Sequence, residues 1–266
     1  MPAAEKRAGS PSPAEALEAA LRAGGALALN HFRRDPRRWM KADGSPVSAA
    51  DLAVDDVLRA TLTGIDGQAG WLSEESADEA GRQAGARAWI VDPIDGTSAF
   101  LAGADTWCIV AALTEAGRPV LAGIYRPVSD DYYGAVAGQG AFLNGQRLAA
   151  SPRRELEGAR VITRRKVLES ERWLKAWPPV VTGMTASLAL RLCLVAQGRF
   201  DAAFALAPKS DWDLAAGDLI VHEAGGRMSD LAGATLVYNR DHTRQAGFVA
   251  AGPALHGEII ARLRPH

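Results

Sequence analysis

The 266-residue sequence contains only two cysteines, Cys108 and Cys193, and both lie inside apolar runs. It has no CxxC pair and no cluster of cysteine and histidine residues. This scarcity argues against a disulfide framework and against a thiolate zinc site. We expect two buried free thiols in a reducing compartment, and therefore a cytoplasmic protein.

Long apolar segments and an excess of one charge are also missing. No run approaches the roughly 20 apolar residues that a membrane helix needs, and the first 13 residues contain no apolar signal core. The 30 basic and 31 acidic residues give a net charge of −1. This balance argues against binding to a nucleic-acid polymer or an anionic membrane. One local basic stretch exists, formed by Arg33, Arg34, Arg37, Arg38 and Lys41.

The composition is that of an ordinary globular protein, with 48% hydrophobic and 23% charged residues. The length suffices for a large core, and no linker separates independent units. We therefore predict one domain over residues 1–266, with a disordered lead-in over 1–12. Its N-terminal half, about 13–155, and its C-terminal half, about 156–266, should pack together.

Periodicity and turn residues predict alternating helices and strands. Residues 33–46 read as a basic loop, and the Asn144-Gly145 pair marks a hairpin within 136–148. A helix over 49–62 is opened by Ser48 with Asp51 three residues later, a variant of the capping box. Further helices are expected over 14–32, 188–197, 212–224 and 254–263, and strands over 70–73, 88–91, 107–114, 120–125, 160–163, 180–182, 202–206 and 247–251. These elements indicate a layered α/β sandwich with an antiparallel or mixed first sheet.

The strongest chemical signal is the run Asp92-Pro93-Ile94-Asp95-Gly96-Thr97, which follows an apolar strand. Proline restricts the turn, so both carboxylates could point at one place, as a hard divalent cation requires. Glycine permits a close approach of the backbone to a ligand, and a helix starting there would offer free amides to an anion. The alternative is a capped turn after a strand.

Three other acidic sets are weaker evidence for a metal site when each is taken alone. Glu74-Glu75 follows a strand, where paired acids are usually solvated. Asp211-Trp212-Asp213 opens a helix, where acids are favoured by capping and by the helix dipole. The segment from Lys41 to Asp51 reads as a flexible loop that ends in a helix cap.

In this order and spacing, the four sets resemble the inositol monophosphatase superfamily of metal-dependent, lithium-sensitive phosphatases. That family has an acid pair after a strand, then Asp-Pro-Ile-Asp-Gly-Thr, then Trp-Asp opening a helix that ends in Glu-Ala-Gly-Gly. The last motif is present here as residues 223–226, and the resemblance covers about 41–238. It implies a layered αβαβα sandwich of the α/β (α+β) class, in which a mixed or antiparallel N-terminal sheet packs on a smaller C-terminal α/β half.

The resemblance also implies a metal site of two to three Mg²⁺ ions. Carried over motif by motif, the first ion would be held by Glu74, Asp92 and the carbonyl of Ile94. The second would be held by Asp92, Asp95 and Asp213, with Asp92 bridging, and a third, weaker ion would lie near Glu74. The reaction implied is in-line attack by a metal-activated water on a phosphate monoester, without a phosphoenzyme.

Other residues take roles around these ions. Glu74 and Thr97 would position the attacking water, and Asp51 is placed to orient Thr97. Backbone amides at Gly96 and Thr97 would bind the phosphate. Lys41 falls where the family has a mobile loop that closes over the site.

The resemblance implies that the substrate is a small soluble phosphate ester, contacted by Asp95, Gly96, Thr97, Ser187, Lys209 and Asp213. Ser187 lies in an Ala-Ser-Leu segment where Gly-Thr or Gly-Ser is usual, which weakens the expected backbone contact. Inositol-specific members carry an acid before Trp-Asp, where this chain has Leu206, and Lys209 suits a second phosphate. Residues 92–100 and the Lys-Ser-Asp-Trp-Asp run resemble bacterial 3′(2′),5′-bisphosphate nucleotidases, which favours a bisphosphate nucleotide as the substrate. The runner-up is an inositol-1-monophosphatase, or a related sugar or histidinol phosphatase.

Two non-enzymatic interpretations of the sequence stay open. One is a regulator that binds RNA or protein through the basic stretch, and the other is a calcium-binding structural module. Members of the family are often homodimers, so the resemblance also implies a homodimer.

Overall fold

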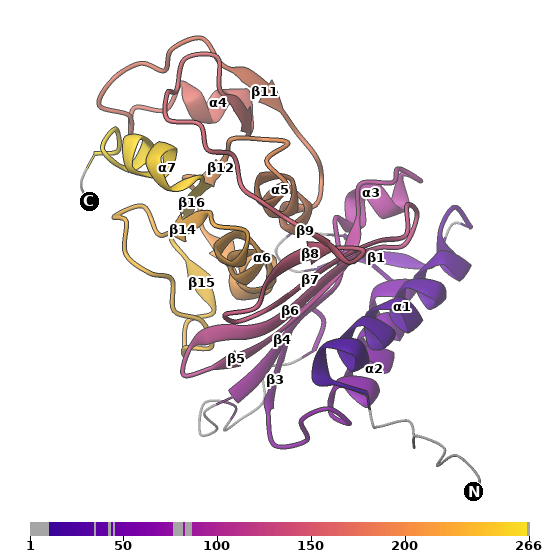
Figure 1. Cartoon of the computed structure of the whole chain (residues 1–266). Helices are drawn as coiled ribbons and strands as arrows, with labels where there is room; N and C mark the ends of the chain where they lie inside the picture. The colour runs from indigo at the N-terminus through magenta and orange to yellow at the C-terminus, as the bar shows by residue number, and fades with distance from the viewer. Residues whose placement is uncertain are drawn as a thin grey trace, which may run out of the picture.

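Figure 1 shows the computed structural model, which describes residues 11–34, 36–41, 44, 46–76, 82 and 87–264. Helices α1 (Pro13–His31) and α2 (Ala49–Leu62) lie side by side on one face of a large sheet. Helices α5 (Leu188–Ala196) and α6 (Asp211–Glu223) separate it from a smaller second sheet, whose outer face is covered by α7 (Pro253–Ile260). The predicted αβαβα layering is confirmed.

The first sheet has seven strands in sequence order. Strand β3 runs parallel to β4, and every later neighbour pairs antiparallel, so the sheet is mixed as predicted. Its strands are β3 (Gly70–Ser73), β4 (Arg87–Asp95), β5 (Cys108–Glu115), β6 (Arg118–Arg126), β7 (Asp131–Val136), β8 (Gly140–Leu143) and β9 (Gln146–Arg147). The predicted hairpin at Asn144-Gly145 joins β8 to β9.

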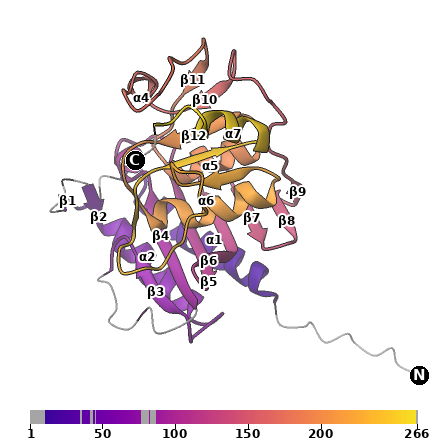
Figure 2. The same ribbon diagram turned by 90° about the vertical axis from the view of Figure 1, so that its left-hand side faces the viewer.

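The second sheet has five strands in the order β11-β10-β12-β16-β14. Its first three strands run parallel, whereas β16 is antiparallel to both of its neighbours. The strands are β10 (Arg160–Ile162), β11 (Val181–Gly183), β12 (Ala202–Ala205), β14 (Arg227–Ser229) and β16 (Phe248–Ala251). The short helix α4 (Arg165–Leu168) follows β10, and Figure 2 shows this half of the molecule from the side.

Helix α1 begins with a full capping box, in which Ser12 and Glu15 each accept the backbone N–H of the other. The predicted disordered lead-in falls largely on residues 1–10, outside the described residues, and Ser12 is already part of the helix cap. Glycines 24 and 25 lower the helix propensity but allow close packing. A Cβ atom at Gly25 would lie only 2.5 Å from a ring carbon of Tyr125.

The expectation of a plain loop over 33–46 was wrong. Strand β1 (Arg38–Met40), which is exposed, pairs antiparallel with the largely buried β2 (Pro46–Ser48) in a two-stranded ribbon. A second ribbon joins β13 (Lys209–Ser210) to β15 (Arg244–Gln245). Strands β7 and β14 and helix α4 were also not predicted. Among the described residues, no helix is both long and apolar enough to cross a membrane.

Candidate active site

The end of strand β4 positions the first two acids. Asp92 pairs with Val110 of β5 and Asp95 pairs with Cys108, so β4 carries one extra residue at this point. Such a bulge re-aims side chains at the end of a strand, and a proline is tolerated there. Both carboxylates are buried, and the Ile94 N–H donates to Asp92 Oδ1 at 3.0 Å.

Helix α6 brings in the third acid, Asp213, from its first turn. The side chain accepts the backbone N–H of Ser210 at 2.9 Å, which fixes it at the start of the helix. One oxygen from each of Asp92, Asp95 and Asp213 lies within 4.8 Å of the other two. The structure therefore gathers these three predicted ligands from elements more than a hundred residues apart in the sequence.

The three carboxylates face one another in a buried place. Burial, together with neighbouring negative charge, raises the pKa of Asp92 well above its ordinary value and that of Asp213 to about 7. Burial also raises the pKa of Asp95, against the lowering effect of its hydrogen bonds. Clustered like charges in a low dielectric are unfavourable unless a cation joins them. Their hard oxygen donors fit Mg²⁺ or a similar divalent ion.

The N-terminus of α5 holds Asp95 in place. Its carboxylate accepts the Ser187 hydroxyl at 2.7 Å and the backbone N–H groups of Leu188 and Ala189 at 3.2 and 2.6 Å. The Ser187 side chain is fully buried and also caps α5. Because its hydroxyl is occupied by Asp95, the geometry favours an orienting role for Ser187 over the predicted contact with substrate.

Glu74 and Glu75 both meet Lys41 at the edge of the site. The Lys41 ammonium lies 2.8 Å from Glu74 and 2.7 Å from Glu75. Burial lowers the pKa of Lys41, but its bonds with the two glutamates raise it overall. Burial raises the pKa of Glu75 to about 7. Lys41, predicted to belong to a closing loop, thus lies beside the predicted metal ligand Glu74, and its neighbours 42, 43 and 45 lie outside the described residues.

Thr97 and Asp51 are brought together as predicted, with the Thr97 hydroxyl 3.1 Å from Asp51 Oδ1 and 3.0 Å from the Ile94 carbonyl. Asp51 is itself fixed by the N–H and hydroxyl of Ser48, at 2.9 and 2.6 Å. Burial raises the pKa of Asp51 in spite of these bonds. A threonine hydroxyl between two acceptors has a defined orientation, which suits the positioning of a water molecule.

Gly96 connects the acids to the short helix α3 (Thr97–Leu101). Its φ of +98° belongs to the left-handed region, and a Cβ atom here would lie 2.9 Å from the Thr106 carbonyl. Only glycine meets both requirements. The backbone next to the acids therefore packs closely against Thr106, which fixes the start of α3 beside them.

Most of the predicted site residues line one cleft of about 650 Å³: Glu74, Asp92, Ile94, Asp95, Gly96, Thr97 and Asp213. The predicted residues Asp51, Ser187 and Lys41 are not part of its lining. Lys209 lines it too, as predicted. Two further cations on its wall, Arg164 and Arg191, were missed. Arg191 is the single charged residue in the otherwise apolar sequence of α5, and that anomaly could have identified it.

Residues 12–266 match the inositol monophosphatase family. The protein named Nus factor SuhB from Pasteurella multocida is 30% identical over 260 residues, which cover 94% of each chain. The inositol-1-monophosphatase of Rhizobium meliloti is 34% identical over 227 residues, 82% of this chain and 84% of the relative.

Solved structures agree with the family match. The extragenic suppressor protein suhB from Bartonella henselae superposes with a TM-score of 0.80 at 28% identity, covering 94% of this chain and 97% of that one. The IMPase of Thermotoga maritima superposes with a TM-score of 0.77 at 27% identity, over 91% and 93% of the two chains.

Proposed function

The chain belongs to the inositol monophosphatase family and is a metal-dependent phosphoric monoester hydrolase, and from this premise we propose that it uses Mg²⁺ to hydrolyse a bisphosphate nucleotide such as 3′-phosphoadenosine 5′-phosphate. The observation that carries the proposal is the group of three carboxylates, two buried and one half-buried, whose oxygens lie within 4.8 Å of one another. In the described part of the chain, no ion pair links any of the three to a basic residue.

We assign Glu74, Asp92 and the Ile94 carbonyl to a first ion, and Asp92, Asp95 and Asp213 to a second. A third, weaker ion would be held near Glu74. Divalent ions bound there neutralise phosphate oxygens, stabilise the leaving alkoxide and make water a better nucleophile.

The surrounding residues orient the reactants. Thr97, held by Asp51, aligns a water molecule with the phosphorus atom, and the amides at Gly96 and Thr97 bind the phosphate oxygens. The Ser187 hydroxyl, together with the N–H groups of Leu188 and Ala189, holds the carboxylate of Asp95 in its orientation.

Two observations support a nucleotide bisphosphate as the substrate. Lys209 lines the cleft beside Asp213 and can hold an additional anionic group. Leu206 stands where inositol-specific members carry an acid for ring hydroxyls, so that contact is missing. The runner-up is an inositol monophosphate, which is supported by the name of the Rhizobium meliloti relative.

The test is phosphate release in the presence of Mg²⁺ from 3′-phosphoadenosine 5′-phosphate, inositol 1-phosphate, fructose 1,6-bisphosphate and histidinol phosphate. We expect the nucleotide to be preferred by at least about tenfold in kcat/KM, which corresponds to about 1.4 kcal/mol of transition-state discrimination. Asp92→Asn should lower turnover about a thousandfold, because a bridging ligand supports several kcal/mol of charge stabilisation.

The matched control is Asp56→Asn, which removes an exposed carboxylate from α2 and should leave turnover unchanged. A preference for inositol 1-phosphate would favour the runner-up. Absence of turnover with every substrate, or equal rates for wild type and Asp92→Asn, would contradict the assignment. Lithium inhibition and dimer formation, both implied by family membership, are measured with the same preparation by adding LiCl and by light scattering.

A second candidate function is that of a regulator which binds RNA or protein on the same fold. Several relatives carry the name Nus factor, which supports it. The exposed strand β1 with Arg38, Trp39 and Met40 provides a surface for such a contact. RNA binding that persists at about 200 mM salt would support this candidate, since simple charge attraction weakens strongly there.

A further inference from the structure

Three cations lie where two hollows of the surface meet. Arg164, Arg191 and Lys209 line the acidic cleft of about 650 Å³, and the same three residues line a neighbouring compartment of about 680 Å³. They come from separate elements: Arg164 precedes α4, Arg191 belongs to α5, and Lys209 belongs to β13. The cleft therefore continues past the acids into a second space, and positive side chains mark the passage.

None of these cations has an acidic partner among the described residues, where ion pairs within 4.0 Å involve other side chains. Arg191 donates to the carbonyls of Thr185 and Ala186 at 3.0 and 3.3 Å, which holds its guanidinium at the passage. Burial lowers the pKa of Arg191, the charges of Asp95 and Asp213 oppose that effect, and the charge of Arg164 adds to it. Three cations gathered without a carboxylate at ion-pair distance favour an anion at this place.

The chemistry of the group suits a phosphate. A guanidinium presents a planar fork of donors to phosphate oxygens, and an ammonium adds a compact charge. The reacting phosphate belongs at the acids and their metal ions. An anion held by the three cations is then a second group of the same substrate, carried by the alcohol that leaves.

The second compartment also has an apolar wall. Val167 and Leu206 are partly exposed there, next to the buried Phe204. Two acids and two further cations line the same space, namely Glu169, Glu171, Lys166 and Arg172. Their charges balance, so the net positive charge of the two hollows lies at the passage, which is the favourable place for an anion. An uncharged flat ring can then lie against the apolar wall.

We propose that Arg164, Arg191 and Lys209 form a subsite for a second phosphate on the leaving group of the substrate, and that the compartment beyond them receives an aromatic ring. The inference deepens the proposed function and rests on it. It names two arginines as specificity-determining residues and restricts the substrate class to nucleoside bisphosphates.

The test compares substrates that differ by one phosphate. With Mg²⁺, kcat/KM is measured for adenosine 3′,5′-bisphosphate against adenosine 3′-monophosphate, and for fructose 1,6-bisphosphate against fructose 1-phosphate. We expect wild type to prefer the adenosine bisphosphate over its monophosphate by at least about tenfold, the size of one or two charge-assisted hydrogen bonds. The fructose pair should show a smaller preference.

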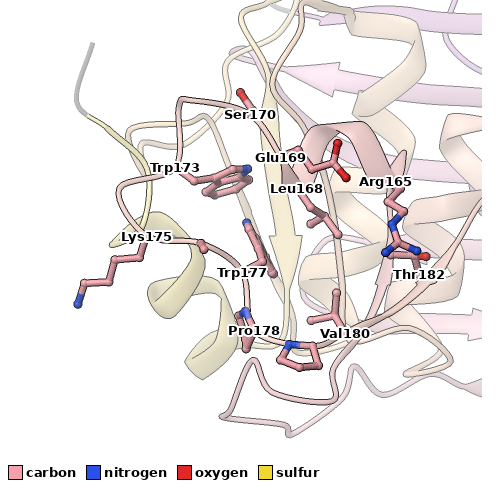
Figure 3. Close-up of a pocket in the computed structure, with 12 residues that line it drawn as sticks. Arg165, Leu168, Glu169, Ser170, Trp173, Lys175, Trp177, Pro178, Val180 and Thr182 are labelled. Carbon is pink, nitrogen blue, oxygen red and sulfur yellow. The ribbon is translucent and has the colours of Figure 1, made fainter.

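Arg191→Gln and Arg164→Gln should each reduce the preference within the adenosine pair about fivefold or more, because one charged donor is lost. Because Arg164 is exposed, its variant still tests the subsite if the substitution of the half-buried Arg191 disturbs folding. Melting curves measure the stability of both variants. Arg165→Gln is the matched control. Arg165 adjoins Arg164 in sequence but lines a separate hollow of about 710 Å³, where Figure 3 shows it beside Thr182. This variant should retain the wild-type preference.

The outcomes separate this inference from the proposed function. Hydrolysis of monophosphates and bisphosphates at equal kcat/KM would overturn the subsite and leave the phosphatase in place. If neither is hydrolysed, the proposed function fails, and calorimetric binding of the two adenosine ligands with Mg²⁺ decides the subsite independently. Equal affinities for the two, or an Arg191→Gln variant that binds the bisphosphate as wild type does, would overturn it.

Discussion

Helix α6 carries two aspartates, Asp213 and Asp218, in opposite situations. Asp218, in the middle of the helix, is fully buried, with Arg118 Nη1 at 2.8 Å and His222 Nδ1 at 2.7 Å. Asp213, one and a half turns earlier, shares its surroundings with Asp92 and Asp95 and has no basic partner within ion-pair distance among the described residues. In charge, the first arrangement is complete within the protein, whereas the second needs a cation from outside. Burial of a carboxylate therefore indicates function only when its partners are considered.

The largest effect should follow from breaking the complete arrangement. Asp218→Asn removes the charge that balances Arg118 and His222, and we expect the free energy of unfolding to fall by about 3 kcal/mol. Urea unfolding measures it. The control Glu258→Gln removes an exposed carboxylate and should change stability by less than about 0.5 kcal/mol. A change of similar size in both variants would show that the Asp218 network contributes nothing specific.

A change of opposite sign in the free energy of unfolding is expected when the incomplete arrangement around Asp213 is altered. In metal-free protein near pH 8, above the pKa of about 7 for Asp213, Asp213→Asn removes an ionised carboxylate and relieves repulsion among the acids. The free energy of unfolding should rise by about 1–2 kcal/mol, since close like charges repel by this order at an effective protein dielectric. Adding Mg²⁺ at about a hundred times its Kd should stabilise wild type by about 2.7 kcal/mol and the variant much less. A variant that is less stable than wild type without metal would refute the comparison.

A smaller effect tests the link between the acids and α5. Ser187→Ala removes a helix cap and the hydroxyl that orients Asp95, so we expect about 1 kcal/mol lower stability and about tenfold weaker Mg²⁺ binding. Ser12→Ala is the matched control, because it removes the cap of α1, far from the acids. It should reproduce the loss of stability without the loss of Mg²⁺ affinity, as measured by calorimetry. If both variants bind Mg²⁺ with equal affinity, Ser187 acts only as the cap of α5.

Local chemistry made much of the site predictable. The capping box of Ser48 and Asp51 and the acids around Asp92 depend on neighbours within a few residues, so their pattern is visible in the sequence. The order of the motifs then indicated which acids would meet. The partner of Thr97 was correctly expected, at a distance of 3.1 Å from Asp51.

The features that were missed depend on distant packing. In β7, Gly134 weakens the strand pattern, but it pairs with Gly123 of β6, where a Cβ atom would lie 2.6 Å from Leu21 of α1. The need for glycine at that point arises only when helix and sheet meet. Arg164 and Arg191 were missed for a similar reason, since only the folded chain brings them to one passage.

The hydrogen bonds of Asp95 to α5 have a consequence for synthesis of the chain. The acid is translated more than ninety residues before Ser187 and Ala189, and Asp213 follows later still. Until α5 has left the ribosome, a growing chain presents Asp95 without the partners that orient it, and Asp213 joins the group only with α6. Because contacts between such distant residues form late in folding, tight binding of a divalent ion would mark a finished molecule rather than a nascent one.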